Sequence, residues 1–127
     1  MIADTVWDAH ALLTSVLAAR KPPRVLVAGY SMGAQVALLL AASEPRITHL
    51  VTMVPPHIDP SLGEIAPARH MERVRQDWLL LTANQDDFAP VADSRALFDT
   101  SPSRRKTHKT FDSGHALPRE YLDEVRR

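Results

Sequence analysis

Residues 24–40 read Arg-Val-Leu-Val-Ala-Gly-Tyr-Ser-Met-Gly-Ala-Gln-Val-Ala-Leu-Leu-Leu. A short valine-rich run, a Gly-x-Ser-x-Gly turn and a series of strong helix formers predict a strand, a sharp turn and a helix. We expect glycine at 29 and 33 because the two backbones approach closely there and side chains would collide. The turn would hold the hydroxyl of Ser31 above the C-terminal end of a sheet. The backbone N–H of Met32, at the start of the helix, would then face any negative charge that develops nearby.

The composition indicates a single domain over residues 1–127, because the length suits one hydrophobic core and no linker or repeat divides the chain. Fifteen basic and fifteen acidic residues cancel, so no overall charge favours nucleic acid or an anionic membrane surface as a partner. The chain has no cysteine, which excludes disulfides, a thiol nucleophile and cysteine metal sites. No apolar run is long enough to span a bilayer, and the N-terminus does not read as a signal peptide. We therefore expect a cytoplasmic protein.

Helical and strand patterns alternate along the chain. The first helix places six apolar residues on one face: Ile2, Val6, Ala9, Leu13, Val16 and Leu17. We expect helices over residues 2–19, 34–43, 68–75, 90–98 and 118–127, strands over 24–28, 47–54, 78–83 and 106–111, and an irregular segment at 57–67. This order is typical of an α/β fold with a parallel sheet of about four strands, flanked by helices.

Four chemically active side chains fall where the predicted strands end, namely Ser31, Asp59, Asp86 and His115. The C-terminal ends of parallel strands meet at one edge of a sheet, where such folds place their chemistry. A serine hydroxyl needs a base within hydrogen-bond reach to become a good nucleophile, and the base needs an acid that orients it. Both Asp59 and Asp86 are candidates for that acid.

No motif in the chain implies a cofactor or a metal. The phosphate-loop and dinucleotide-binding fingerprints are both missing from the sequence. The pair His57 and Asp59 supplies only two potential ligands, too few for a good metal site.

The chain resembles the α/β-hydrolase superfamily at three points. The Gly29-Tyr30-Ser31-Met32-Gly33 turn resembles the nucleophile elbow of that family. The strand ending in Ala83-Asn-Gln-Asp86, followed by Pro90, resembles the segment that carries the family's acid, with alanine in place of the usual glycine. Gly114-His115 resembles the segment that carries its base.

The resemblance implies a role for each of these residues. Ser31 would be the nucleophile, His115 the base and Asp86 the acid, in the chain order that the family uses. Asp59 is the alternative acid, since some members place the acid after the preceding strand. The Met32 N–H would be an oxyanion donor, and no cofactor is implied.

The resemblance covers only the C-terminal half of the family's domain, from the helix before the elbow onward. The family's earlier strands and its second oxyanion donor have no counterpart here. Two interpretations follow. One is a serine hydrolase acting on a small-molecule ester, thioester or similar acyl bond. The other is a non-catalytic or weakly active half-domain that functions only by association with another chain.

The strand at 24–28 also predicts a contact with a partner. Val25, Leu26 and Val27 form the apolar run of a strand that is normally paired on both sides. With no earlier strand to cover it, this edge should promote homo-oligomers, unless the helix at 2–19 folds over it.

Overall fold

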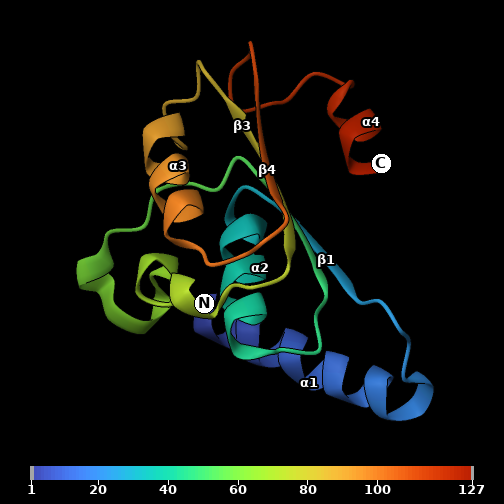
Figure 1. The fold of residues 1–127 in the computed structure, drawn as a ribbon. Helices are drawn as coiled ribbons and strands as arrows, with labels where there is room; N and C mark the ends of the chain where they lie inside the picture. Colours follow the sequence, from blue (N-terminus) through green and yellow to red (C-terminus); the bar gives the residue numbers. More distant parts are fainter. Residues whose placement is uncertain (1, 127) are drawn as a thin grey trace.

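The computed structural model describes residues 2–126 and contains one parallel sheet (Figure 1). Its strands are β1 (Leu26–Tyr30), β2 (His49–Met53), β3 (Asp77–Ala83) and β4 (Lys106–Phe111). They lie in the order β1-β2-β3-β4, and every neighbouring pair is parallel. The expected four-stranded parallel sheet is therefore confirmed.

Helices cover both faces of this sheet. They are α1 (Ile2–Arg20), α2 (Met32–Ser43), α3 (Val91–Thr100) and α4 (Tyr121–Arg126). Figure 1 shows α2 and α3 on one side of the strands and α4 on the other. Each parallel pair of strands is joined by a segment that crosses one face, which is how parallel strands must be connected.

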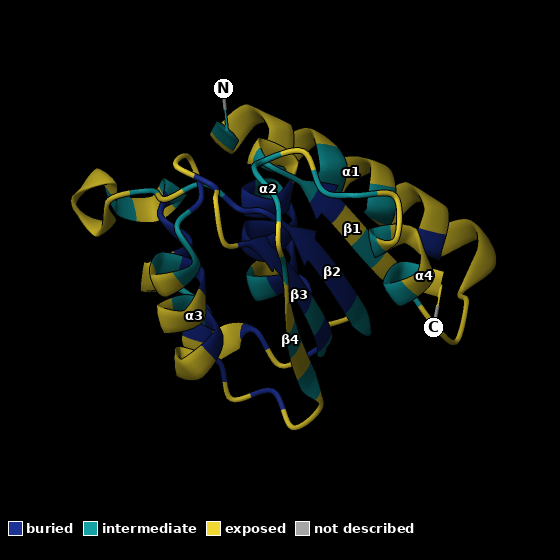
Figure 2. Ribbon diagram, turned by 90° about the horizontal axis from the view of Figure 1, so that it is seen from above, coloured by how far each residue is buried: buried dark blue, intermediate teal, exposed yellow. Residues whose placement is uncertain are grey.

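The alternation of side chains along the strands divides the core into two layers. On β2 and β3, Leu50 and Leu80 pack with α2 and α3, in a cluster that includes Trp78 and Phe98. Val51 and Leu81 face the other way and pack near α4. Figure 2 shows the two central strands largely buried, whereas β1 and β4 carry exposed positions. The central strands are apolar on both faces because helices cover both faces.

Several predicted boundaries differ from the structure by one to three residues, and one predicted helix is absent from the described residues. Strand β1 begins two residues later than expected and continues through Gly29 and Tyr30. The helix expected over 68–75 is instead a series of 3₁₀ turns, η1 (Pro60–Ile65), η2 (Pro67–Arg69) and η3 (Met71–Arg73). His70, between the last two turns, has φ of −127° and ψ of 4°. These angles lie outside the α-helical region, so one continuous helix cannot form.

Helix α1 is mostly exposed, but its predicted apolar face is the less exposed one. On that face Leu17 is buried, Ile2, Val6, Ala9 and Leu13 are half-buried, and Val16 is exposed. The helix packs against α2. Across residues 2–126, no backbone hydrogen bond joins α1 to β1. Within the described residues, no strand pairs with the outer edge of β1.

A buried carboxylate anchors α1 to the end of α2. Glu44 bonds the guanidinium of Arg46 at 2.7 Å and lies 3.2 Å from the ring of His10 on α1. The hydrogen bond to Arg46 is the main cause that lowers the pKa of Glu44 from 4.5 to about 2. The carboxylate consequently stays ionised at neutral pH and can hold His10.

Among the described residues, no helix is both long and apolar enough to cross a bilayer.

Candidate active site

Ser31 occupies a strained turn between β1 and α2. Its backbone has φ of 57° and ψ of −122°, a region that side-chain-bearing residues rarely adopt. Backbone bonds hold the turn, because the Ser31 N–H donates to the Met53 carbonyl at 2.8 Å and the Ala34 N–H donates to the Ser31 carbonyl at 2.9 Å. The hydroxyl is thereby fixed at the C-terminal end of the sheet.

The glycines of the motif are not equivalent. A Cβ atom at Gly29 would lie 2.1 Å from the Gly33 carbonyl oxygen, so only glycine fits there. A Cβ at Gly33 would meet open space, and one at Gly114 would come no closer than 3.9 Å to the Gln85 carbonyl. The expected collision at position 33 is therefore wrong, because Gly33 contributes its backbone to the close contact and a side chain there would point elsewhere.

Ser31, His115 and Asp86 form one continuous chain of hydrogen bonds. The Ser31 Oγ lies 2.8 Å from His115 Nε2, and His115 Nδ1 lies 2.6 Å from Asp86 Oδ2. A carboxylate only accepts hydrogen bonds, so the proton of the neutral ring is on Nδ1. Nε2 is then free to accept the serine hydroxyl, which is the arrangement that activates a nucleophile.

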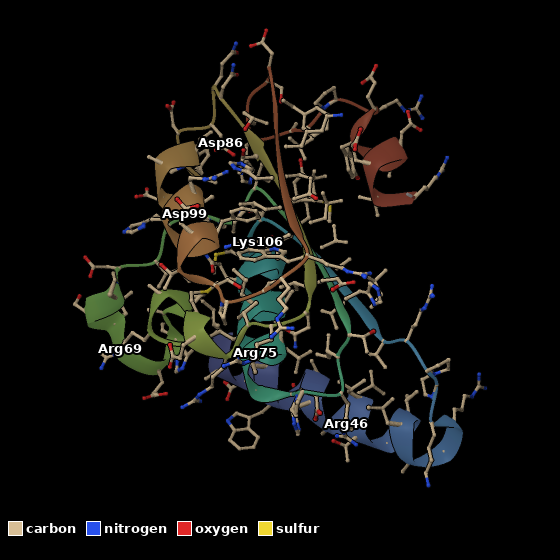
Figure 3. All side chains as sticks on the ribbon, viewed as in Figure 1. Arg46, Arg69, Arg75, Asp86, Asp99 and Lys106 are labelled. Carbon is tan, nitrogen blue, oxygen red and sulfur yellow. The ribbon has the colours of Figure 1, made fainter. Side chains whose placement is uncertain are left out.

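The carboxylate of Asp86 is held on both of its oxygens. Its Oδ1 accepts the backbone N–H groups of Phe88 and Ala89, each at 2.9 Å, while Oδ2 faces His115. The side chain is fully buried. Figure 3 shows Asp86 beyond the end of β3, near the start of α3. These contacts fix the orientation of the Asp86 carboxylate.

Tyr30 connects the elbow to the histidine loop. Its hydroxyl donates to the His115 carbonyl at 2.7 Å and accepts the Leu117 N–H at 2.8 Å. The sequence indicated Tyr30 only as a position of the elbow. The bonds of its hydroxyl to His115 and Leu117 had no local signal in the sequence, because these partners lie 85 and 87 residues further along the chain.

Phe88 is a neighbour of the site that the sequence reasoning missed. Its ring lies 5.7 Å from that of His115 in an edge-on arrangement, although 73% of the residue is exposed. The one available signal was an aromatic residue two positions after Asp86 in an otherwise polar turn.

Asp59 lies elsewhere in the structure. Its carboxylate accepts the Ser61 N–H at 2.8 Å at the start of η1, and this bond is the first cause that lowers the pKa of Asp59. The imidazole of the neighbouring His57 lies 3.7 Å from the carboxylate of Asp93. Within residues 2–126, no group of three or more histidine, aspartate or glutamate side chains is placed to hold a metal ion.

Met32 is the first residue of α2, so its N–H has no acceptor within the helix. The positive end of the helix dipole also lies there, which makes this N–H a suitable donor to an oxyanion. In the described residues, no further strand stands beside β1 to offer a second donor.

The description of the Alpha/beta hydrolase family matches residues 3–126. The chain belongs to this family. The match extends from α1 to α4 and therefore includes Ser31, Asp86 and His115. No curated protein matches the chain.

Solved esterases and lipases share the fold of this alpha/beta hydrolase. An acetyl xylan esterase from Paenibacillus sp. R4 superposes with a TM-score of 0.85 at 17% identity, over 97% of this chain and 50% of its own. A cold-adapted esterase from an Arctic intertidal metagenomic library has a TM-score of 0.79 at 22% identity, over 96% of this chain and 58% of the esterase. The Paleococcus ferrophilus monoacylglycerol lipase superposes with a TM-score of 0.76 at 17% sequence identity. This superposition covers 95% of the present chain and 72% of the lipase. The present chain thus spans between half and about three quarters of these proteins.

Proposed function

We propose that this protein is a serine hydrolase that cleaves carboxylic esters, or a similar acyl bond such as a thioester, in small molecules. The observation that carries the proposal is the continuous hydrogen-bond chain from Ser31 through His115 to Asp86. The esterase and lipase names of the structural neighbours agree with this chemistry. No cofactor takes part in the proposed reaction.

The proposed reaction has two halves. Ser31 Oγ attacks the carbonyl carbon while His115 Nε2 takes its proton, and the buried Asp86 stabilises the imidazolium that forms. The Met32 N–H donates to the oxyanion of the tetrahedral intermediate. His115 then gives its proton to the leaving alkoxide, and an acyl-enzyme remains. In the second half His115 activates water, which attacks the acyl group and releases the acid and Ser31.

Hydrolysis of p-nitrophenyl acetate and butyrate tests the proposal. The wild-type chain should release p-nitrophenol above the background rate, and Ser31→Ala should return the rate to background. Circular dichroism of the variant serves as the folding control. If Ser31→Ala retains the wild-type rate, the nucleophile is assigned wrongly.

The second candidate function is a weakly active or non-catalytic half-domain that requires another chain. This candidate is favoured because, in the described residues, β1 has no strand on its outer side and the Met32 N–H is the one donor that the helix start offers beside Ser31. Loss of one donor typically costs ~10²–10³ in turnover, whereas labelling by a fluorophosphonate needs mainly an activated serine. Labelling of Ser31 without ester turnover would support the weakly active form. Absence of both Ser31 labelling and ester turnover would support a non-catalytic half-domain.

A further inference from the structure

Phe88 holds a large apolar side chain in water beside the proposed base. Its ring centroid lies 5.7 Å from that of His115, and 73% of the residue is exposed. A ring that is mostly hydrated removes little apolar area from water and therefore adds little to the stability of the fold. Single exposed apolar residues are common on proteins, so the position next to His115 is what points to a role.

The backbone of Phe88 is fixed on both sides of its side chain. Its N–H donates to Asp86 Oδ1 at 2.9 Å, and its C=O accepts the His57 N–H at 3.4 Å. The next residue, Ala89, is fully buried and donates to the same carboxylate oxygen. The ring keeps only the rotations of its own side chain, so a ligand that contacts it has little further freedom to remove.

Two aromatic rings lie beside His115, and they differ in what they bond. Tyr30, with its ring centroid 6.1 Å from that of His115, is half-buried, and its hydroxyl holds the His115 carbonyl and the Leu117 N–H. Phe88 has no polar group and faces solvent. It follows β3, which has a paired strand on either side, so its exposure does not arise at an edge of the sheet.

The proposed mechanism decides which part of an ester would meet the Phe88 ring. His115 Nε2 returns its proton to the leaving alkoxide, so that oxygen must come within about 3 Å of Nε2. The carbon chain of the alcohol therefore begins beside the imidazole, within reach of a ring 5.7 Å from it. The acyl part is instead bonded to Ser31, and its oxyanion faces the Met32 N–H.

We infer that Phe88 is a specificity-determining residue that binds the alcohol part of the substrate. An alkyl or aryl group laid on the exposed ring removes apolar area of both partners from water. The site consequently favours esters of larger apolar alcohols over esters of short ones. This inference rests on the proposed function, because it takes the direction of proton transfer from the role of His115.

Ethyl butyrate and hexyl butyrate test the inference, because they share one acyl group and their alcohols have similar acidity. The wild-type chain should cleave the hexyl ester with a kcat/KM ~10-fold above that of the ethyl ester, and Phe88→Ala should bring this ratio to about one. The change should lie in KM, since the ring contacts the alcohol equally before and during the reaction. Titration of the released acid at constant pH measures both rates.

Three controls separate this contact from a general disturbance of the site. Phe88→Tyr retains the ring and should retain the preference for the hexyl ester. Leu62→Ala removes another exposed apolar side chain, on η1, and should leave the preference unchanged. The ratio between ethyl hexanoate and ethyl butyrate should be the same in Phe88→Ala as in the wild-type chain. A wild-type chain without the hexyl preference, or a preference that survives in Phe88→Ala, would overturn the inference, as would an equal loss of acyl-chain preference.

A binding measurement separates a failure of this inference from a failure of the proposed function. 1-Hexanol is the alcohol part alone and needs no catalysis. In an NMR titration it should shift the amide resonances of Phe88, Ala89 and His115, with a Kd about tenfold higher for Phe88→Ala. If both esters are cleaved but 1-hexanol affects the two chains equally, the inference fails and the proposed function stands. If neither ester is cleaved but 1-hexanol binds as expected, the hydrolase assignment fails and the alcohol site stands.

Discussion

The two sides of Ser31 differ in how completely they are built. On one side, Ser31 is within hydrogen-bond distance of His115, His115 is bonded to Asp86, and backbone N–H groups hold the Asp86 carboxylate. On the other side, one helix N–H and an exposed strand edge are all that the described residues supply. In the proposed mechanism, the groups that activate Ser31 come from segments after the elbow. The surroundings that would stabilise charge on the substrate depend on what covers β1.

This difference separates the activation of Ser31 from the stabilisation of the oxyanion, two properties that a turnover measurement combines. Activation of Ser31 needs only groups within this chain, so it should be strong. Stabilisation of the oxyanion and enclosure of substrate need the open side, so they should be weak. Four kinds of variant test the contrast, from the largest expected effect to the smallest.

Removal of the nucleophile or the base should have the largest effect. Ser31→Ala and His115→Ala should each reduce ester turnover ~10⁴-fold or to background, because the members of such a triad act as a unit. The double variant should lose little more than either single one. Initial rates with p-nitrophenyl butyrate provide the measurement. Losses that multiply in the double variant would mean that the two residues act separately.

Substitution of Asp86 should reduce turnover slightly less than substitution of His115. Asp86→Asn keeps the shape but presents an amide N–H₂ to His115 Nδ1, which favours the wrong tautomer and should cost ~10³–10⁴ in turnover. Asp59→Asn is the control and should leave turnover unchanged, since Asp59 bonds the Ser61 N–H. A large loss in Asp59→Asn with a small one in Asp86→Asn would reverse the assignment.

Loss of the link between the elbow and the histidine loop should have an intermediate effect. Tyr30→Phe removes the hydroxyl that bonds the His115 carbonyl and the Leu117 N–H. We expect turnover to fall about tenfold and stability by about 1 kcal/mol, as two part-buried backbone groups lose a partner. Tyr121→Phe is the matched control. Urea unfolding and initial rates measure both quantities, and an unchanged rate would show that the loop holds its position without Tyr30.

The open edge should contribute least to the stability of the single copy. Leu26→Ala should cost under about 0.5 kcal/mol when the chain is dilute, because the side chain is already largely in water. Leu50→Ala, on the neighbouring strand and 1% exposed, should cost about 2–5 kcal/mol. Urea unfolding at low protein concentration compares them. Similar losses for the two variants would mean that the edge of β1 is covered.

Some features of the site could be predicted because they are local. The spacing of glycine and serine at 29–33 implies a sharp turn, and the apolar runs before and after it imply a strand and a helix. The collision that excludes a side chain at Gly29 is part of that turn. Asp86 could be preferred over Asp59 because the residues around it match a known segment, whereas its bonds to Phe88 and Ala89 were not visible in the pattern.

Other features arise only when distant segments meet. The amphipathic pattern of residues 2–19 predicts which face of α1 turns inward, but how deeply that face is buried depends on the surface opposite, and α1 meets mainly α2. The 3₁₀ turns replace a helix because His70 adopts angles that break it.

By itself, the sequence determined the order of strands and helices, the turn at Ser31 and the candidate acid and base, since each depends on residues close together in the chain. Only the tertiary structure decided the distances among Ser31, His115 and Asp86, the second role of Tyr30 and the exposure of β1. These depend on contacts between segments up to 87 residues apart, and side-chain periodicity carries no information about which segments become neighbours.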